Sequence, residues 1–300
     1  MAKDAVTGQC KLCGSTAELC LSHILPAFVY RWLKKRSGAG GHIRNSDSPN
    51  RRVQDGVKEH WLCVACEQMF SADETAFANG IFHPFSRGEV PVTYGPYMLR
   101  FCTSVSWRVL KFAFGKNPDA RYSNEQATLI DEAENRWRDY LLGRARHPDK
   151  FEQHVIPWGT ISETTIPDLP QNINRFLSGS VTLDIVGSQT SLMTFAKLGP
   201  IMIFGHIQST KRTWEGTKIR LTDGRFPSKE YVLPPALLPL LYEKANAITQ
   251  GWSKLSDQQT KLIDETLLAK GDKFFDTPQG KAVLADAEMF GISSVLSRDS

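Results

Sequence analysis

The sequence predicts an α+β fold, in which a small N-terminal module held together by cysteines precedes a body of helices and a small β-sheet. Two Cys-x-x-Cys pairs lie within the first 66 residues, and short β-branched segments gather between residues 181 and 233. Segments with apolar residues at helical spacing lie on both sides of that region. A chain of 300 residues exceeds the usual size of one domain, so we expect two, residues 1–90 and 91–300.

The N-terminal module is expected to contain two helices and a strand. Residues 24–35 have apolar side chains at helical spacing, and Pro26 suits a first helical turn. Residues 37–52 are rich in Gly, Ser, Asn and Asp, which predicts a long exposed loop, typical of a functional segment. Val57–Leu62 is predicted to be a short strand. The helix that follows begins near the second cysteine pair and ends near Asn79-Gly80.

The body is expected to begin with two helices. The apolar segment from Tyr97 predicts a buried helix, and the capping box Ser123-Asn-Glu-Gln126 opens another that runs to about Leu142. Helices return after Pro235, with N-caps at Ser256 and Thr277. Between these helical parts we predict a small sheet from four short segments, residues 181–187, 200–207, 216–221 and 230–233.

Positive charge is concentrated in the N-terminal part of the chain. Residues 1–116 contain 15 Lys and Arg against 9 Asp and Glu, a net charge of +6, whereas the remainder has a net charge of −2. Such a concentration attracts a phosphate backbone through counterion release, and a solvated loop is the alternative interpretation. We predict nucleic-acid contacts from eight cations, Arg31, Lys34, Lys35, Arg36, Arg44, Arg51, Arg52 and Lys58.

The two cysteine pairs, Cys10/Cys13 and Cys63/Cys66, are the most specific motif in the chain. Two Cys-x-x-Cys turns supply the tetrahedral sulfur set that Zn²⁺ prefers, and Gly14 allows the first turn to close tightly. Because closing a loop of 49 residues between the pairs is entropically costly without a metal, we expect a structural zinc site. Separate redox or core cysteines are the alternative.

Composition also limits where the protein can work. No run of about 18 apolar residues is present, so no membrane-spanning helix is predicted. The first ten residues lack the apolar segment of a signal peptide. We therefore expect a cytoplasmic protein, whose paired cysteines bind metal instead of forming disulfides. Cys20 and Cys102 have apolar neighbours and are predicted to be free, buried thiols.

A family resemblance is carried by three stretches of residues 8–85. These are the first cysteine pair with its following glycine, Ser22-His23-Ile24-Leu25-Pro26, and Leu62-Cys63-Val64-Ala65-Cys66 at the start of a helix. Together they resemble the zinc-stapled HNH endonucleases of the ββα-metal type. The resemblance implies a metal-dependent DNA endonuclease, in which zinc holds the module and a separate Mg²⁺ or Mn²⁺ ion acts on the scissile phosphate.

The resemblance also implies roles for three residues. His23 is expected to be the general base that deprotonates water, a role that suits imidazole because it exchanges protons near neutral pH. Glu67 stands where the family has its last histidine, and it is a predicted ligand of the catalytic divalent ion. Glu74 lies two helical turns further along the same face and is predicted to supply a second oxygen.

The sequence departs from the family pattern in front of the histidine and on the second strand. Ser22 stands where the family has an acidic residue, which removes one metal ligand. Lys58 stands where the family has the asparagine that orients the histidine. The nearby residues that could replace this asparagine are Gln54, Asp55, Glu59 and His60.

Each expected role has a structural alternative. His23 can be a hydrogen-bonded core histidine, Glu67 a carboxylate that interacts with a helix dipole, and Glu74 a surface residue. For the whole protein, the alternatives are a zinc-finger module that binds nucleic acid or protein without catalysis, and a structural adaptor. The expected partners are DNA and either a regulatory protein subunit or a second copy of the chain. Analogy with such nuclease modules also suggests a bacterial anti-phage effector.

Overall fold

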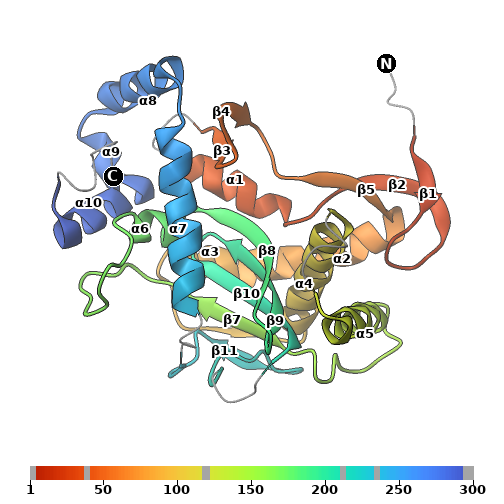
Figure 1. The fold of residues 1–300 in the computed structure, drawn as a ribbon. Coiled ribbons are helices and arrows are strands. Elements are labelled where there is room, and N and C mark those ends of the chain that lie inside the picture. Colours follow the sequence, from red (N-terminus) through yellow and green to blue (C-terminus); the bar gives the residue numbers. More distant parts are fainter. Residues whose placement is uncertain (1–4, 37–40, 117–121, 210–213, 233–236, 293–300) are drawn as a thin grey trace.

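The computed structural model describes residues 5–36, 41–116, 122–209, 214–232 and 237–292. It confirms the predicted α+β class. An antiparallel sheet lies at the centre, a small cysteine-containing sheet lies at one end, and three C-terminal helices lie at the other (Figure 1). These helices are α8 (Asp257–Lys270), α9 (Lys273–Asp276) and α10 (Pro278–Phe290). Within these residues, no helix has the length and apolar composition needed to cross a lipid bilayer.

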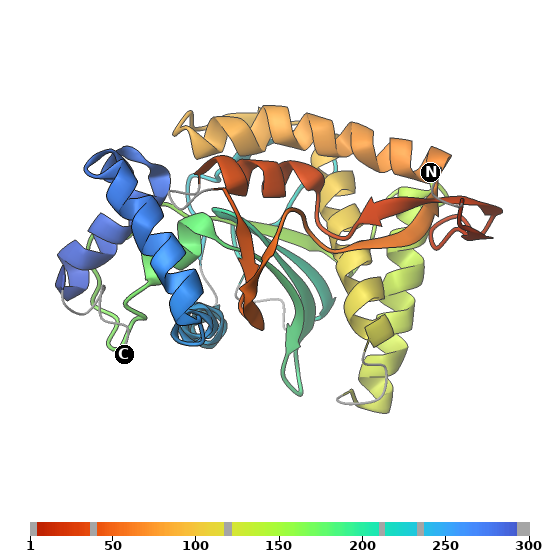
Figure 2. The ribbon, with the colours of Figure 1, turned by 90° about the horizontal axis from the view of Figure 1, so that it is seen from above.

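The N-terminal sheet has the order β1-β2-β5 and is antiparallel. Its strands are β1 (Thr7–Gln9), β2 (Thr16–His23) and β5 (Lys58–Cys63), and the last confirms the predicted strand. Helix α2 (Val64–Phe77) follows β5 without a loop and packs against β2 and β5, as Figure 2 shows from above. His23, the last residue of β2, pairs with Lys58, the first residue of β5, so the histidine lies at the end of this strand pair where the chain leaves towards α1.

Between β2 and β5 the chain forms α1 (Ala27–Arg36) and a β-hairpin of β3 (Ile43–Asn45) and β4 (Ser48–Val53). The helix confirms the expectation for residues 24–35. The prediction of an irregular loop over residues 37–52 is wrong where the hairpin forms, and residues 37–40 lie outside the described part. Most residues of both strands are polar. The sequence therefore lacks the alternation of apolar and polar residues that would have predicted these strands.

The helix after the second cysteine pair continues past its predicted end at Asn79-Gly80. A π-helical turn, η1 (Ala78–Phe82), connects α2 to α3 (His83–Ser86). Ile81 and Phe82 are completely buried, which holds this segment against the core. The glycine serves close packing instead of termination, because a Cβ at Gly80 would lie 2.8 Å from the Tyr97 hydroxyl.

The central sheet has the order β7-β10-β9-β8, with every neighbouring pair antiparallel. Its strands are β7 (Gln153–Pro157), β8 (Val181–Gly187), β9 (Leu192–Leu198) and β10 (Ile201–Gln208). Helix α4 (Tyr97–Lys116) covers one face, while α6 (Ile173–Gly179) and α7 (Leu237–Ser253) cover the other. Burial of both faces explains why β9 and β10 are apolar almost throughout.

Predictions for the sheet are partly correct. Strands β8 and β10 confirm two of the four predicted segments, whereas β7 and β9 were not predicted. Residues 216–221 form only one bridge, from Lys218 to His154, and residues 230–232 form no strand, so both predictions are wrong there; Leu233 lies outside the described part. A two-stranded sheet of β6 (Val92–Tyr94) and β11 (Gly224–Phe226) forms instead.

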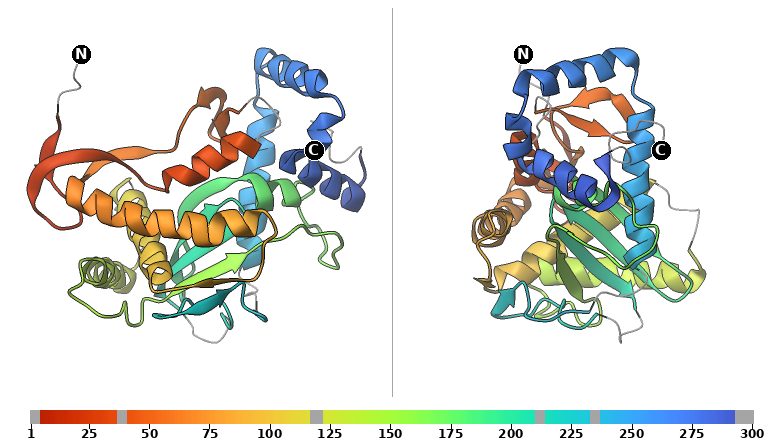
Figure 3. Two further views of the ribbon diagram at one scale, coloured as in Figure 1. Left: turned by 180° about the vertical axis from the view of Figure 1, so that it is seen from behind. Right: turned by 90° about the vertical axis from the view of Figure 1, so that its left-hand side faces the viewer.

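The predicted helix starts in the body are confirmed. Ser123 and Gln126 form a complete capping box at α5 (Asn124–Leu141). Ser256 caps α8 and Thr277 caps α10, each accepting a backbone hydrogen bond from the first turn. Buried Asp286 then ties α10 to α6 by accepting hydrogen bonds from the backbone of α6. The β3–β4 hairpin lies beside α7 and α8 (Figure 3), and Arg44 donates to Gln259 of α8.

Two stacked histidines in the central sheet predict acid sensitivity. His154 and His206 are each 3% exposed, with ring centroids 4.1 Å apart. Burial lowers the pKa of both, that of His206 to about 3. The unfolded chain therefore binds protons below about pH 6.5 that the folded chain does not, so stability falls as the pH falls from about 6.5 towards 3.

We expect His206→Phe to reduce this pH dependence, because phenylalanine can keep the ring stacking without binding a proton. By pH 4, His206 alone costs the folded state roughly 3 kcal/mol relative to pH 7. Urea unfolding at pH 7 and pH 4 measures the difference. His147→Phe, at a partly exposed histidine, is the control and should keep the wild-type pH dependence. Equal pH dependence of all three proteins would contradict the prediction.

Candidate metal centre and adjoining active site

The four paired cysteines form one cluster at the base of α2. Their Sγ atoms lie within 4.8 Å of one another, and all four are free of disulfides. The first pair lies on a turn in which Gly14 donates to the carbonyl of Cys10 at 2.9 Å with φ of +82°. The second pair joins β5 to the first turn of α2. The predicted cluster is therefore confirmed, and it is compatible with a structural zinc ion.

The chemistry of the cluster also fits zinc. Sulfurs around a tetrahedral Zn²⁺ lie about 3.8 Å apart, and the Sγ atoms of Cys13 and Cys63 are 3.8 Å apart. Hydrogen bonds from Ser15 lower the pKa of Cys13 to about 6, whereas burial raises the pKa of Cys66. Four thiolates at this spacing repel one another strongly unless a cation lies among them.

Glu67 lies in the first turn of α2, directly after the last cysteine of the cluster. Its Oε2 atom accepts a 2.6 Å hydrogen bond from the hydroxyl of Ser22, which is only 2% exposed. The structure therefore brings the predicted ligand Glu67 to the residue that precedes His23. It also brings together the two positions at which the resembled family carries metal ligands.

His23 ends β2 and is held by a carboxylate. Its Nε2 atom lies 2.9 Å from Oδ1 of Asp55, and its ring stacks on that of Tyr30 with centroids 6.2 Å apart. Asp55 also contacts Lys58, at 2.6 Å, and accepts from the backbone of Gly56. Burial would raise the pKa of Asp55, but the hydrogen bonds from Lys58, His23 and Gly56 outweigh it and lower this pKa to about 2.

Of the four residues considered as substitutes for the family's asparagine, Asp55 is therefore the one that contacts His23. A charged carboxylate fixes the orientation of the imidazole. His60 points elsewhere, with its Nδ1 atom 3.1 Å from the carbonyl oxygen of Leu19.

Glu74 forms an ion pair with Arg108, a residue that the sequence analysis did not identify. Its Oε1 atom lies 2.8 Å from Nη1 of Arg108, whose side chain is 4% exposed. The same nitrogen donates to the carbonyl oxygen of His23 at 3.0 Å. Arg108 of α4 thus ties together the end of β2 and the middle of α2. The available signal was an arginine between Trp107 and Val109 in a helix predicted to be buried, since a buried guanidinium needs an acidic partner.

The structure does not gather the three predicted catalytic residues into one ligand set. Among the described residues, the cysteine cluster is the only group of three or more His, Cys, Asp or Glu side chains close enough to hold one ion. A Mg²⁺ ion retains several waters and needs only one or two carboxylates, so Glu67 could hold one with few protein ligands.

The eight predicted nucleic-acid contacts fall into two groups. Four already have partners: Lys34 donates to the carbonyl of Gln54, Arg44 to Pro49 and Gln259, Lys58 pairs with Asp55, and Arg36 lies on Trp32. The other four are exposed and make no ion pair within the described residues. They are Arg31, Lys35, Arg51 and Arg52.

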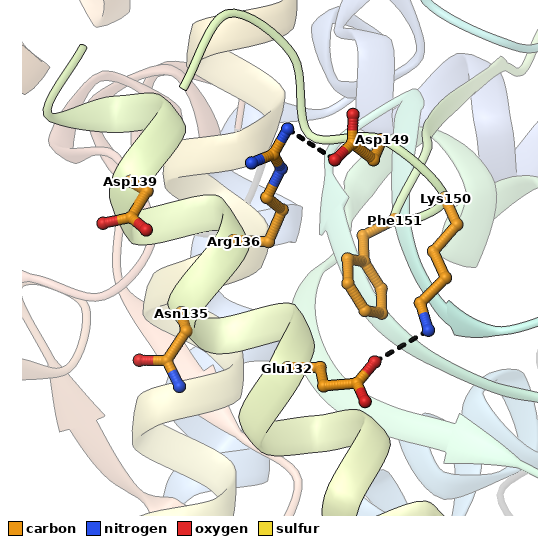
Figure 4. A pocket seen from close by; sticks show the side chains of 7 residues that line it. All are labelled: Glu132, Asn135, Arg136, Asp139, Asp149, Lys150 and Phe151. Atoms are coloured by element: carbon orange, nitrogen blue, oxygen red, sulfur yellow. Dashed lines mark hydrogen bonds and ion pairs between the residues drawn. The ribbon is translucent and has the colours of Figure 1, made fainter. Parts of the chain in front are cut away.

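A surface hollow of about 520 Å³ lies elsewhere, along α5 (Figure 4). Its charged groups are largely paired with one another: Arg136 with Asp149, and Lys150 with Glu132 at 2.7 Å. No predicted site residue lines it. We therefore assign the candidate site to the end of the β2–β5 strand pair that carries His23, and not to this hollow.

Fold and site together define a class, an α+β protein whose four-cysteine cluster joins a three-stranded sheet to a helix that carries acidic residues. The chain matches no protein-family model, no curated protein and no solved structure. The resemblance to HNH endonucleases therefore rests on the quoted sequence motifs alone.

Proposed function

We propose that this protein is a metal-dependent endonuclease that hydrolyses phosphodiester bonds of DNA. The observation that carries the proposal is the contact between Ser22 and Glu67. It puts a carboxylate against the residue that precedes an imidazole held by Asp55. A base and a ligand for a hard cation are the minimum that a one-metal phosphodiesterase requires.

In this proposal His23 takes a proton from the water that attacks phosphorus, and the new P–O bond forms as the bond to the leaving oxygen breaks. Asp55 stabilises the imidazolium that results. A Mg²⁺ or Mn²⁺ ion at Glu67, when bound, would polarise the phosphoryl oxygens and neutralise the leaving oxygen. Glu74 and Arg108 act on geometry, because they fix the backbone of His23 through a buried ion pair.

The test is cleavage of plasmid DNA by the purified protein with Mg²⁺ or Mn²⁺. We expect nicked and then linear DNA with either metal, and none with EDTA. Since zinc in a four-cysteine site is removed slowly, a brief EDTA treatment distinguishes the two metals if zinc content is measured alongside. Failure of the wild-type protein to cut DNA or RNA with any divalent metal would remove the proposal.

A non-catalytic binding module is the second candidate function. It is favoured by Ser22, which replaces an acidic ligand and already satisfies one oxygen of Glu67. This candidate predicts DNA binding that depends on salt and needs no divalent ion other than zinc. Binding without cleavage, unchanged by Mg²⁺, would support it over the endonuclease.

The exposed cations predict how strongly DNA is held. Replacing Arg31, Lys35, Arg51 and Arg52 by glutamine should weaken binding of any DNA sequence. It should also reduce the slope of log K against log salt by about 3.6, since each of the four phosphate contacts contributes roughly 0.9. Fluorescence anisotropy at several salt concentrations measures both. The matched control replaces four exposed cations of the body, Arg144, Arg146, Lys261 and Lys273. Equal slopes for the two variants would contradict the prediction that these four N-terminal cations contact the DNA phosphates.

Regulation by a partner belongs to the same proposal. The C-terminal part of the chain, from α7 onward, exposes several large apolar side chains, among them Leu268 at 80% and Ile292 at 69% exposure. Trp252, Phe275 and Leu284 are also at least 40% exposed. Such surface is typical of a docking face, which supports a regulatory subunit or a second copy of the chain. A role in anti-phage defence in the cytoplasm would require such control of the nuclease.

A further inference from the structure

We propose that a basic cavity at the C-terminal end of α1 binds a single phosphate group. The cavity has a volume of about 150 Å³ and lies among α1, α6, α10 and the segment that contains Thr160. Arg36 and Lys281 line it together with the polar side chains of Thr160, Asn174 and Ser178. None of the described residues that line it is acidic. A small cavity with two cations and no carboxylate favours an anion.

Arg36 lacks the counter-charge that comparable arginines of this protein have. Its guanidinium is half-buried over Trp32, 4.4 Å from the ring centroid, and burial lowers its pKa to about 10. Within the described residues no carboxylate forms an ion pair with it. In contrast, Arg108 pairs with Glu74 and Arg175 pairs with Asp286. A guanidinium withdrawn from water without an anion is destabilising, and an anion in the cavity would offset this cost.

A second buried cation makes the same region more positive. Lys197 is completely buried, and its ammonium group donates to the carbonyl oxygens of Leu177, Ser180 and Gly199. These contacts satisfy its hydrogens but supply no negative charge. Burial and, second, the charge of Arg36 lower the pKa of Lys197, so the two cations are close enough to repel each other.

The size of the cavity limits the ligand. A volume of 150 Å³ corresponds to roughly five water molecules at about 30 Å³ each. A phosphate group fits this space, whereas a nucleobase or sugar attached to it would stay outside. The cavity is separate from the proposed cleavage site. Helix α1 has 10 residues, so Arg36 at its C-terminal end lies roughly 15 Å from the N-terminal end of the helix, which is the end nearer to His23 in the chain. The inference therefore does not depend on the nuclease proposal.

The first experiment measures thermal unfolding of the full chain in increasing inorganic phosphate, with ionic strength held constant by sodium chloride. We expect the melting temperature to rise and to saturate. Arg36→Gln and Lys281→Gln should each raise the half-saturating phosphate concentration by about tenfold or more, because each removes a charged hydrogen bond. The matched controls are Lys261→Gln and Lys273→Gln, at exposed cations of the C-terminal helices that do not line the cavity. Lys281 is exposed, so its variant stays informative even if Arg36→Gln does not fold.

A second titration identifies the source of the phosphate group. If saturating phosphate weakens binding of a 12-nucleotide single-stranded DNA, and Lys281→Gln weakens both ligands, the group belongs to a nucleic-acid backbone. If Lys281→Gln weakens phosphate alone, the group belongs to a free phosphorylated small molecule. A stabilisation that does not saturate, or that is equal in the wild-type protein and all four variants, overturns the site.

Discussion

Cys66→Ser is expected to abolish zinc binding and to unfold the N-terminal sheet. The cluster connects the turn after β1 to the start of α2 across 49 intervening residues, and β1 is an edge strand that pairs with β2 alone. Structural zinc sites contribute on the order of 10 kcal/mol to folding, which is comparable with the whole stability of a domain. Bound zinc should fall from about one ion per chain to none, and the unfolding temperature should fall steeply.

The matched control for this prediction is Cys20→Ser, at a half-buried thiol of β2 that lies outside the cluster. It should retain zinc and keep a nearly unchanged unfolding temperature. Elemental analysis measures the metal, and calorimetry with limited proteolysis measures the fold. If Cys66→Ser retains zinc, or melts within about 2 °C of the wild-type protein, the cluster carries little of the stability.

Local signals in the sequence were sufficient for the elements that satisfy their own hydrogen bonds. The capping residues Ser123, Ser256 and Thr277 were predicted correctly, because an N-cap acts within a single helical turn. Strand β9 was missed because Lys197 interrupts its apolar run. Only the tertiary structure supplies the three carbonyl oxygens that allow this lysine to be buried.

The candidate site shows the same division. The cysteine cluster could be predicted because two Cys-x-x-Cys turns with a glycine are nearly sufficient for the geometry of a four-sulfur site. The partners of the two glutamates could not be predicted. Ser22 and Glu67 are 45 residues apart in the sequence. Glu74 and Arg108 belong to helices on either side of the predicted domain boundary. Which of four polar residues would orient His23 also depended on how the chain returns from the β3–β4 hairpin.

Removal of the imidazole at the end of β2 should have the largest effect on catalysis. We expect His23→Ala to lower the rate of DNA cleavage by about 10²- to 10⁴-fold, the usual contribution of a general base. The affinity for DNA should change little, because the exposed cations that we expect to contact phosphates are untouched. Single-turnover cleavage with saturating Mn²⁺ measures the chemical step, and zinc content and unfolding temperature verify that the variant is folded.

Two further variants separate the chemical role of His23 from a structural one. Asp55→Asn should slow cleavage less than His23→Ala, because an amide can still orient the imidazole but cannot stabilise its protonated form. His60→Ala removes an exposed histidine from the neighbouring strand and should leave the rate unchanged. If His23→Ala cuts DNA as fast as the wild-type protein, the imidazole is not the base. The contact between Asp55 and His23 would then serve only to hold the end of β2 against the chain that leads into β5.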